Sequence, residues 1–181
     1  TIDRVLRVIN DKIWEEQLRP DTLLTIGTNV ISKKIKQRLR ATKPTQHIHI
    51  GAEHTLMDTY QCLSHYIEAN IDESLTALVK LLQVQKGNYN NIWLEYKQVA
   101  EQKHRTFTDK LPYSDLLVYK QIHKHLPTTY NIQWANSSVI RYAQLFNFAS
   151  GIRHYGNRGV SGIDGSSSTA VGFTHAKKEP T

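Results

Sequence analysis

The chain has 181 residues, 39% of them hydrophobic, so it is long enough to bury a core as one domain or as two small ones. Lys and Arg number 23 against 16 Asp and Glu, and the formal net charge of +7 suits acidic partners such as nucleic acid, acidic lipid or carboxylate and phosphate substrates. No apolar run is long enough to span a bilayer, and no stretch reads as a signal peptide. The single cysteine, Cys62, excludes an internal disulfide and favours a cytoplasmic location.

Strand-like and helix-like segments alternate in the first half of the chain. The hydrophobic periodicity predicts helices over residues 1–18 and 30–42, strands over 23–27, 46–51 and 64–69, and a further helix from residue 72. This alternation is typical of βαβ units and a parallel sheet. The inner face of the last helix is predicted to consist of Leu75, Leu78, Val79 and Leu82.

The helix expected over residues 30–42 is amphipathic, with cations on its outer face. These cations, including one just beyond the helix, are Lys33, Lys34, Lys36, Arg38, Arg40 and Lys43. No aromatic residue is interleaved with them to stack on bases, so a solvated face or a subunit contact is preferred and no nucleic acid partner is expected. The alternative function is a non-enzymatic basic α/β module that binds nucleotides or RNA through the Lys33–Lys43 helix.

Histidines alternate with apolar residues over 46–51, which predicts a strand with His47 and His49 on one side. Together with Glu53 and His54 they have the residue types of a zinc site. No cysteine or second His pair is placed to complete a tetrahedron, so we favour histidines on an exposed strand face. Three further histidines are also expected at the surface: His65, His123 and His125.

Residues 86–91, Lys-Gly-Asn-Tyr-Asn-Asn, are the most linker-like stretch and predict a domain boundary. A connecting helix is expected over 92–104, and another helix runs from Pro112 toward Leu126. A strand is expected over 130–135, and a helix follows residues 136–138. The predicted division is therefore 1–86, a linker and connecting helix over 87–110, and 111–181.

Residues 155–165 are the most distinctive stretch, because glycine recurs at every third position from Gly156 to Gly165. Such a backbone can adopt positive φ and approach a ligand closely. Interleaved apolar residues favour an ordered loop between a strand and a helix over a flexible linker, and Asp164 or Ser166 is expected to cap that helix. Ligands of open α/β sheets bind at the carboxyl ends of strands, so residues 136–137 and 157–165 are expected on one rim.

The segment Asn157–Gly165 reads Asn-Arg-Gly-Val-Ser-Gly-Ile-Asp-Gly and resembles the signature of the 2-succinyl-5-enolpyruvyl-6-hydroxy-3-cyclohexene-1-carboxylate synthases, thiamine-diphosphate enzymes of menaquinone biosynthesis. Asn136–Arg141 is similar to a motif that precedes this signature in the family. The resemblance implies an α/β fold in which 1–86 is the later part of a Rossmann-like central domain with an incomplete parallel sheet. Residues 111–181 would then hold the first βα units of a diphosphate-binding domain.

The resemblance also implies an activity for a longer protein, and both chain ends read as cuts. That protein would be a transferase and homo-oligomer that decarboxylates 2-oxoglutarate and adds the succinyl unit to isochorismate, using thiamine diphosphate with Mg²⁺ or Mn²⁺. Such enzymes hold the metal with a Gly-Asp motif and use a glutamate from a separate domain. No Gly-Asp dipeptide occurs in this sequence, and no segment resembles the glutamate-bearing domain. We expect the chain alone to be inactive, with no catalytic residue and no complete metal site.

Six residues are nominated for binding roles by the same resemblance. Arg158 would bind a substrate carboxylate, and the residues near the cofactor would be Asn136, Ser137, Ser161, Gly162 and Ile163. Asn136 and Ser137 have the side chains either to donate to a diphosphate or to cap the following helix. Asp164 is interpreted as a helix cap rather than a catalytic acid, and the role of Arg141 stays open.

Overall fold

A computed structural model describes residues 2–27, 30–52, 58–83 and 87–181. Its contacts divide the chain into two compact units, essentially Arg4–Ala100 and Glu101–Thr181. The division falls within the long helix α5 (Tyr89–Thr108), which confirms the connecting helix expected over 92–104 and extends it at both ends. The three-part division at residues 86 and 110 stays a prediction.

None of the helices in the described ranges combines the length and apolar character needed to cross a membrane.

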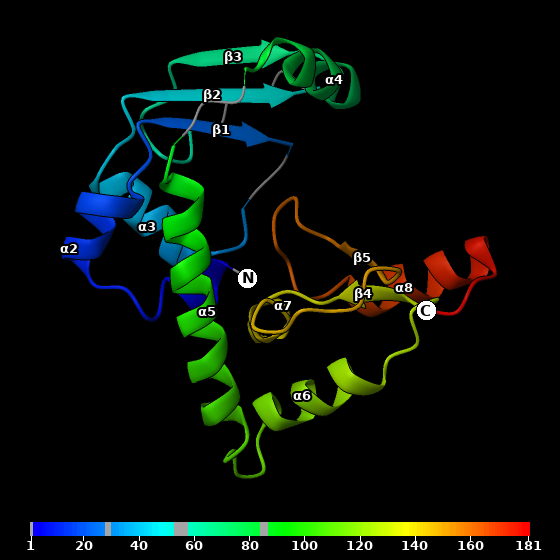
Figure 1. Ribbon diagram of the computed structural model, residues 1–181. Coiled ribbons are helices and arrows are strands. Elements are labelled where there is room, and N and C mark those ends of the chain that lie inside the picture. Colours follow the sequence, from blue (N-terminus) through cyan, green and yellow to red (C-terminus); the bar gives the residue numbers. More distant parts are fainter. Residues whose placement is uncertain (1, 28–29, 53–57, 84–86) are drawn as a thin grey trace. The chain divides into compact units, whose positions relative to one another are not determined.

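The first unit contains a three-stranded parallel sheet, as the sequence predicts. Its strands are β1 (Thr22–Ile26), β2 (Gln46–Gly51) and β3 (His65–Glu68), in the order β1-β2-β3. Helix α3 (Lys33–Ala41) connects β1 to β2, and helix α4 (Ile71–Leu81) follows β3 (Figure 1). Gly27 directly follows β1 and has a φ of 73°, a conformation that residues with a Cβ rarely adopt.

The hydrophobic core of this unit is built mainly by the N-terminal segment and α3. Its buried members are Val5, Leu6, Ile9, Trp14, Leu18, Ile35, Leu39, Tyr60 and Ala100. The indole Nε1 of Trp14 donates to Thr42 Oγ1 at 2.6 Å, so the largest core side chain also has its polar atom satisfied. Ser32 caps α3 by accepting a hydrogen bond from the Ile35 amide.

The prediction of one continuous helix over residues 1–18 is wrong. The segment instead forms α1 (Ile2–Val5), α2 (Asp11–Ile13) and a π-helical turn, η1 (Trp14–Leu18). Asn10 is extended, and its side chain accepts a hydrogen bond from the Ile13 amide at 2.9 Å. An N-cap of this kind starts a new helix, so Asn10 interrupts the helical backbone. The helical spacing of apolar residues nevertheless continues on both sides of this break.

Some cations on the outer face of α3 contact other residues of the first unit. The Arg38 guanidinium lies 3.1 Å from an Asp11 carboxylate oxygen and 5.4 Å from the Trp14 ring centroid. Arg40 Nε donates to the Thr59 carbonyl at 2.6 Å. At least two of the six cations therefore stabilise contacts with neighbouring segments of the same unit, while the preference for a solvated face or a subunit contact stays a prediction.

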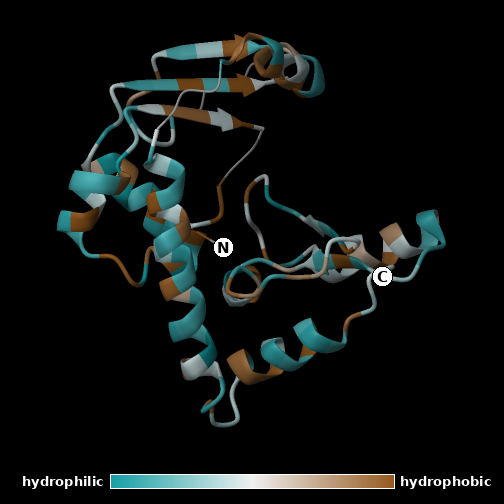
Figure 2. Cartoon of the chain, viewed as in Figure 1, coloured by the Kyte–Doolittle hydropathy of each residue, from teal (hydrophilic) through white to brown (hydrophobic). Residues whose placement is uncertain are grey.

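The buried face predicted for α4 is wrong within this chain. Asn70 caps the helix by accepting from the amides of Asp72 and Glu73, but no α4 residue is buried. Val79 is 75% exposed and Leu82 is 68% exposed, and hydrophobic residues recur along α4 in Figure 2. Periodicity reports that a helix is amphipathic, whereas burial depends on whether a partner covers the apolar side.

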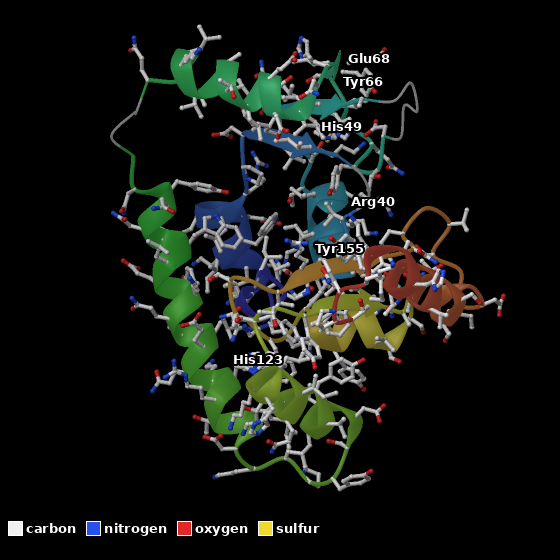
Figure 3. The ribbon with its side chains drawn as sticks, turned by 90° about the vertical axis from the view of Figure 1, so that its right-hand side faces the viewer. Arg40, His49, Tyr66, Glu68, His123 and Tyr155 are labelled. Carbon is white, nitrogen blue, oxygen red and sulfur yellow. The ribbon has the colours of Figure 1, made fainter. Side chains whose placement is uncertain are left out.

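The histidines of β2 do share one side of the strand, but the prediction that His47 is exposed is wrong, because only 2% of its surface is accessible. Thr25 Oγ1 on β1 lies 2.8 Å from His47 Nε2 and 2.8 Å from His49 Nδ1. The His49 ring also stacks on Tyr66 of β3 (Figure 3). Within the described ranges no three His, Cys, Asp or Glu residues gather as a metal site, and Glu53 and His54 lie outside those ranges.

Burial lowers the pKa of His47, and the neighbouring His49 lowers it further, while Asp58 opposes both effects. A neutral imidazole also suits the contact with Thr25, because a hydroxyl can donate to one ring and accept from the other. The two histidines and the threonine therefore join neighbouring strands through polar side chains beneath the surface.

The second unit contains a two-stranded parallel sheet with helices around it. Helix α6 (Asp115–His125) comes first, followed by β4 (Asn131–Trp134), α7 (Ser138–Ala143), β5 (Arg153–Gly156) and α8 (Ser166–Lys177) (Figure 1). The predicted strand, glycine-rich loop and helix are therefore confirmed. The observed mixed α/β architecture with parallel sheets is the one expected of Rossmann-like units.

Aromatic and imidazole rings pack together beside β4 and β5. Trp134 Nε1 donates to His154 Nδ1 at 2.9 Å and the two rings stack, while Phe148 contacts both edge-on. Burial lowers the pKa of His154, consistent with a ring nitrogen that accepts a hydrogen bond. His123 on α6 (Figure 3) is half-buried rather than fully exposed, because its ring packs against Phe146 and Phe148. Its Nε2 donates to the Asn147 carbonyl at 2.6 Å. His65 and His125 are exposed, as expected.

We predict that Leu18→Ala lowers the free energy of unfolding by about 2–5 kcal/mol, because the substitution leaves a cavity in a fully buried site. The matched control is Leu82→Ala, which removes the same atoms from an exposed position and is expected to change stability by less than about 0.5 kcal/mol. Denaturant unfolding of the two variants and the parent measures both values. Equal losses at the two positions would show that the core is not where the structure has it.

We predict that His47→Gln reduces the loss of stability on acidification. Because the pKa of His47 is lowered in the folded state, the unfolded chain takes up this proton first as the pH falls below about 6.5, and the parent loses stability from there downward. Glutamine can still hydrogen-bond to Thr25 but does not titrate. Denaturant unfolding between pH 8 and 5 should therefore give a shallower decline in the variant, and parallel declines would contradict the neutral, buried His47.

Candidate functional site

The rim that carries the candidate site is formed where β4 and β5 end. The strands run parallel, with Trp134 opposite Gly156 in the register. Asn136 and Asn157 follow these strand ends on the same edge of the sheet, as the sequence predicts. The loop 157–165 then leads from β5 into α8, so the two motifs are brought together by the pairing of their strands.

Asn136 is the central side chain of this rim, with 3% of its surface exposed. Its Nδ2 donates to the carbonyls of Asn157 and Gly162, at 2.8 Å and 2.6 Å. Its Oδ1 accepts a hydrogen bond from Arg158 Nη1 at 2.5 Å. One amide therefore contacts three residues of the loop, and its predicted role as a cofactor ligand stays a prediction.

Arg158 is half-buried, and its guanidinium is held from one side by Asn136. Its Nε is buried and finds no hydrogen-bond partner among the residues that the structure describes. A guanidinium has five N–H donors in a planar fork that matches carboxylate and phosphate oxygens. The guanidinium is therefore oriented by one hydrogen bond, and it has further N–H groups that can donate to an anionic ligand.

Ser137 has an unusual backbone, with φ 68° and ψ −129°. A positive φ is uncommon for a residue with a Cβ, and such conformations cluster at functional sites. Ser137 stands at the N-cap of α7 but its side chain makes no capping hydrogen bond, and Asn136 uses its amide elsewhere. Of the two alternatives left open for these side chains, capping of the following helix does not occur, because the Asn136 amide bonds to the loop and the Ser137 side chain makes no capping bond.

The loop uses its glycines differently from the sequence expectation. Positive φ occurs within it at Ser161, at 58°, and not at Gly159 or Gly162. A Cβ built on either of those two glycines would meet nothing within 4 Å in the described structure. Packing within the chain therefore does not require glycine at these positions, and the loop leaves open space along its backbone.

Helix α8 begins at Ser166 without a side-chain cap, so the caps expected from Asp164 or Ser166 are wrong. Gly165 occupies the N-cap position instead. The loop is fastened to the first turn by another route, because Asn157 Nδ2 donates to Thr169 Oγ1 at 2.7 Å and Thr169 Oγ1 donates to the Gly165 carbonyl at 2.8 Å. The sequence analysis did not identify Thr169 as part of the rim. The one sequence signal for it was Asn157, a polar residue of the signature whose side chain needs a hydrogen-bond partner.

Two apolar side chains of the loop point into solvent rather than into the core. Val160 is 98% exposed and Ile163 is 66% exposed. Tyr155, at the end of β5 (Figure 3), packs against Phe173 of α8 with ring centroids 4.7 Å apart, so the root of the loop is better packed than its tip. The tip therefore offers an apolar surface beside the oriented guanidinium.

The largest features of this unit outside the loop lie away from the rim. A cavity of about 730 Å³ lies between β4 and α8 and is lined by residues such as Tyr130, Ile132 and Val171, but by none of the rim residues. Arg141 is exposed on α7. No cluster of three or more His, Cys, Asp or Glu side chains occurs in the described part of the chain, at the rim or elsewhere.

Comparison with known proteins relates nearly the whole chain to one kind of enzyme. No protein-family model matches the sequence. The chain is 37% identical over 180 residues to the 2-succinyl-5-enolpyruvyl-6-hydroxy-3-cyclohexene-1-carboxylate synthase of Flavobacterium psychrophilum, in an alignment that covers 99% of this chain and 32% of the relative. The synthase of the same name from Bacteroides thetaiotaomicron is 38% identical over 158 residues, covering 87% of this chain and 27% of the relative.

A third relative, the synthase of Porphyromonas gingivalis, is 33% identical and covers 96% of this chain and 31% of its own length. The chain thus spans about a third of the length of the curated relatives it matches. Because the first of these alignments covers 99% of the chain, it includes both motifs of the rim as well as the first unit. By sequence, the chain belongs to the 2-succinyl-5-enolpyruvyl-6-hydroxy-3-cyclohexene-1-carboxylate synthase family.

Proposed function

We propose that the chain is part of a thiamine-diphosphate-dependent synthase that decarboxylates 2-oxoglutarate and adds the succinyl unit to isochorismate. The observation that carries the proposal is the Arg158 guanidinium, which a buried amide orients at the carboxyl edge of two parallel strands. Both substrates carry carboxylates, and a planar guanidinium binds a carboxylate through two parallel hydrogen bonds. Arg158 is proposed to bind and orient such a carboxylate.

The residues of the rim fit a thiamine-diphosphate site in part. Thiamine diphosphate supplies the carbanion-stabilising chemistry when it is bound. Ser161, Gly162 and Ile163 are proposed to form a shelf for its aminopyrimidine ring, since Gly162 has no side chain to obstruct a ring and Ile163 is exposed. Ser137, at the start of α7 where its side chain makes no capping hydrogen bond, is proposed to face the diphosphate.

The remaining parts of the active site are proposed to come from outside this chain. In the full-length homo-oligomer they would include the Mg²⁺ or Mn²⁺ site and a glutamate of another domain. Residues 1–86 would form the later part of the central domain, and residues 111–181 the beginning of the diphosphate-binding domain. The support for this assignment is the alignment of nearly the whole chain with a third of each relative.

We predict that Arg158→Ala in the full-length protein raises the KM for 2-oxoglutarate or isochorismate by about 10- to 100-fold, the loss expected for one charge-assisted contact to a carboxylate. Steady-state kinetics with each substrate measures the change and shows which carboxylate Arg158 binds. The matched control is Arg153→Ala, because Arg153 is exposed and pairs with Glu179 near the chain's C-terminal end. Unchanged KM values for both substrates in Arg158→Ala would refute the proposed role.

We also predict that the 181-residue chain by itself shows no carboligation, because the residues proposed to hold the metal and the glutamate of another domain are elsewhere. The measurement follows isochorismate consumption with 2-oxoglutarate, thiamine diphosphate and Mg²⁺ present. Addition of the purified full-length protein to the same mixture is the positive control. Turnover by the chain alone would show that the proposed division of the active site is wrong.

A further inference from the structure

The most constrained polar side chain in the second unit is Asn136, and its contacts suggest a role beyond ligand binding. It lies two residues after the end of β4, and its three hydrogen-bond partners are 21, 22 and 26 residues away in the sequence. Because the side chain is almost completely buried, these bonds form away from competing water. Breaking them would leave two carbonyls and a guanidinium to find new partners.

The donor side of Asn136 fixes the path of the loop. A carboxamide has two N–H hydrogens, and here one bonds to the Asn157 carbonyl and the other to the Gly162 carbonyl. Both carbonyls are therefore drawn to one nitrogen, which closes the segment 157–162 into a tight arc. Neither hydrogen remains for a diphosphate oxygen.

The acceptor side of Asn136 fixes the direction of Arg158. Its Oδ1 accepts from Nη1, so one corner of the guanidinium fork is pinned to the end of β4. The Nε of Arg158 is buried and has no hydrogen-bond partner in the described residues. An arginine held in this way has less rotamer freedom to lose when it binds an anion.

We propose that Asn136 is a positioning residue, which closes the 157–162 loop and aims the Arg158 guanidinium at the substrate carboxylate instead of contacting the cofactor. The inference rests on the proposed function for the identity of the ligand of Arg158. The positioning itself rests only on the contacts within this chain.

The first test is a double-mutant cycle in the full-length protein with Asn136→Ala, Arg158→Ala and the double variant. If Asn136 acts through Arg158, Asn136→Ala raises the KM for the same carboxylate substrate by about tenfold or more, and the double variant is within about threefold of Arg158→Ala alone. The dissociation constant of thiamine diphosphate, measured by fluorescence quenching, changes by less than about threefold. The control pair, Asn136→Ala with Arg153→Ala, gives independent effects that multiply.

A cofactor ligand would behave differently in the same cycle. Asn136→Ala would then weaken thiamine diphosphate binding by tenfold or more, and its effect would multiply with that of Arg158→Ala. This outcome overturns the positioning role. If Arg158→Ala itself leaves the KM values of both substrates unchanged, the proposed function fails, and the positioning role is decided by the second test.

The second test uses the 181-residue chain and needs no activity. Trypsin cleaves after Arg158 only when the loop opens, so Asn136→Ala is expected to accelerate this cut by about tenfold or more relative to the cut after Arg153. The control is Ser137→Ala, which changes the neighbouring residue but removes no capping bond. Equal cleavage rates at Arg158 in the parent and in Asn136→Ala would overturn the inference.

Discussion

Asn136 carries the contacts on which the rim of the second unit depends. A buried carboxamide must have its hydrogen bonds made inside the protein, and this one finds all its described partners in a single loop. The strand pairing of β4 with β5 brings that loop within reach, and the amide then selects one conformation of it. The orientation of Arg158 and the exposure of the loop tip both follow from this choice.

The first unit also uses a polar side chain to join neighbouring strands. Thr25 lies between two imidazoles of the neighbouring strand, so its hydroxyl is paired across β1 and β2, although the buried His47 Nδ1 finds no partner in the described residues. Burial lowers the pKa of His47, and the neutral ring is the form that such an environment accepts. In both units, then, a short polar side chain near a strand joins segments that are far apart in the sequence.

The order of strands and helices, the parallel sheets and the shared rim could all be predicted, because periodicity and capping residues act over a few neighbouring positions. The predictions that were wrong failed for two kinds of physical reason. Some depend on local hydrogen bonding, and others depend on contacts with distant parts of the chain. Asn10 breaks the N-terminal helix by capping a new one, and the apolar face of α4 lacks a cover in the described chain. The loop glycines suggested positive φ, but Ser161 adopts it instead.

The sequence by itself determined the family through its motifs, the alternation of elements, and the residue types available at the rim. Only the tertiary structure decided which of those residues touch one another. The amide of Asn136 has the same chemistry whether it caps a helix, binds a diphosphate or holds a loop. Its partners lie more than twenty residues away, and the pairing of two strands brings them within hydrogen-bonding distance.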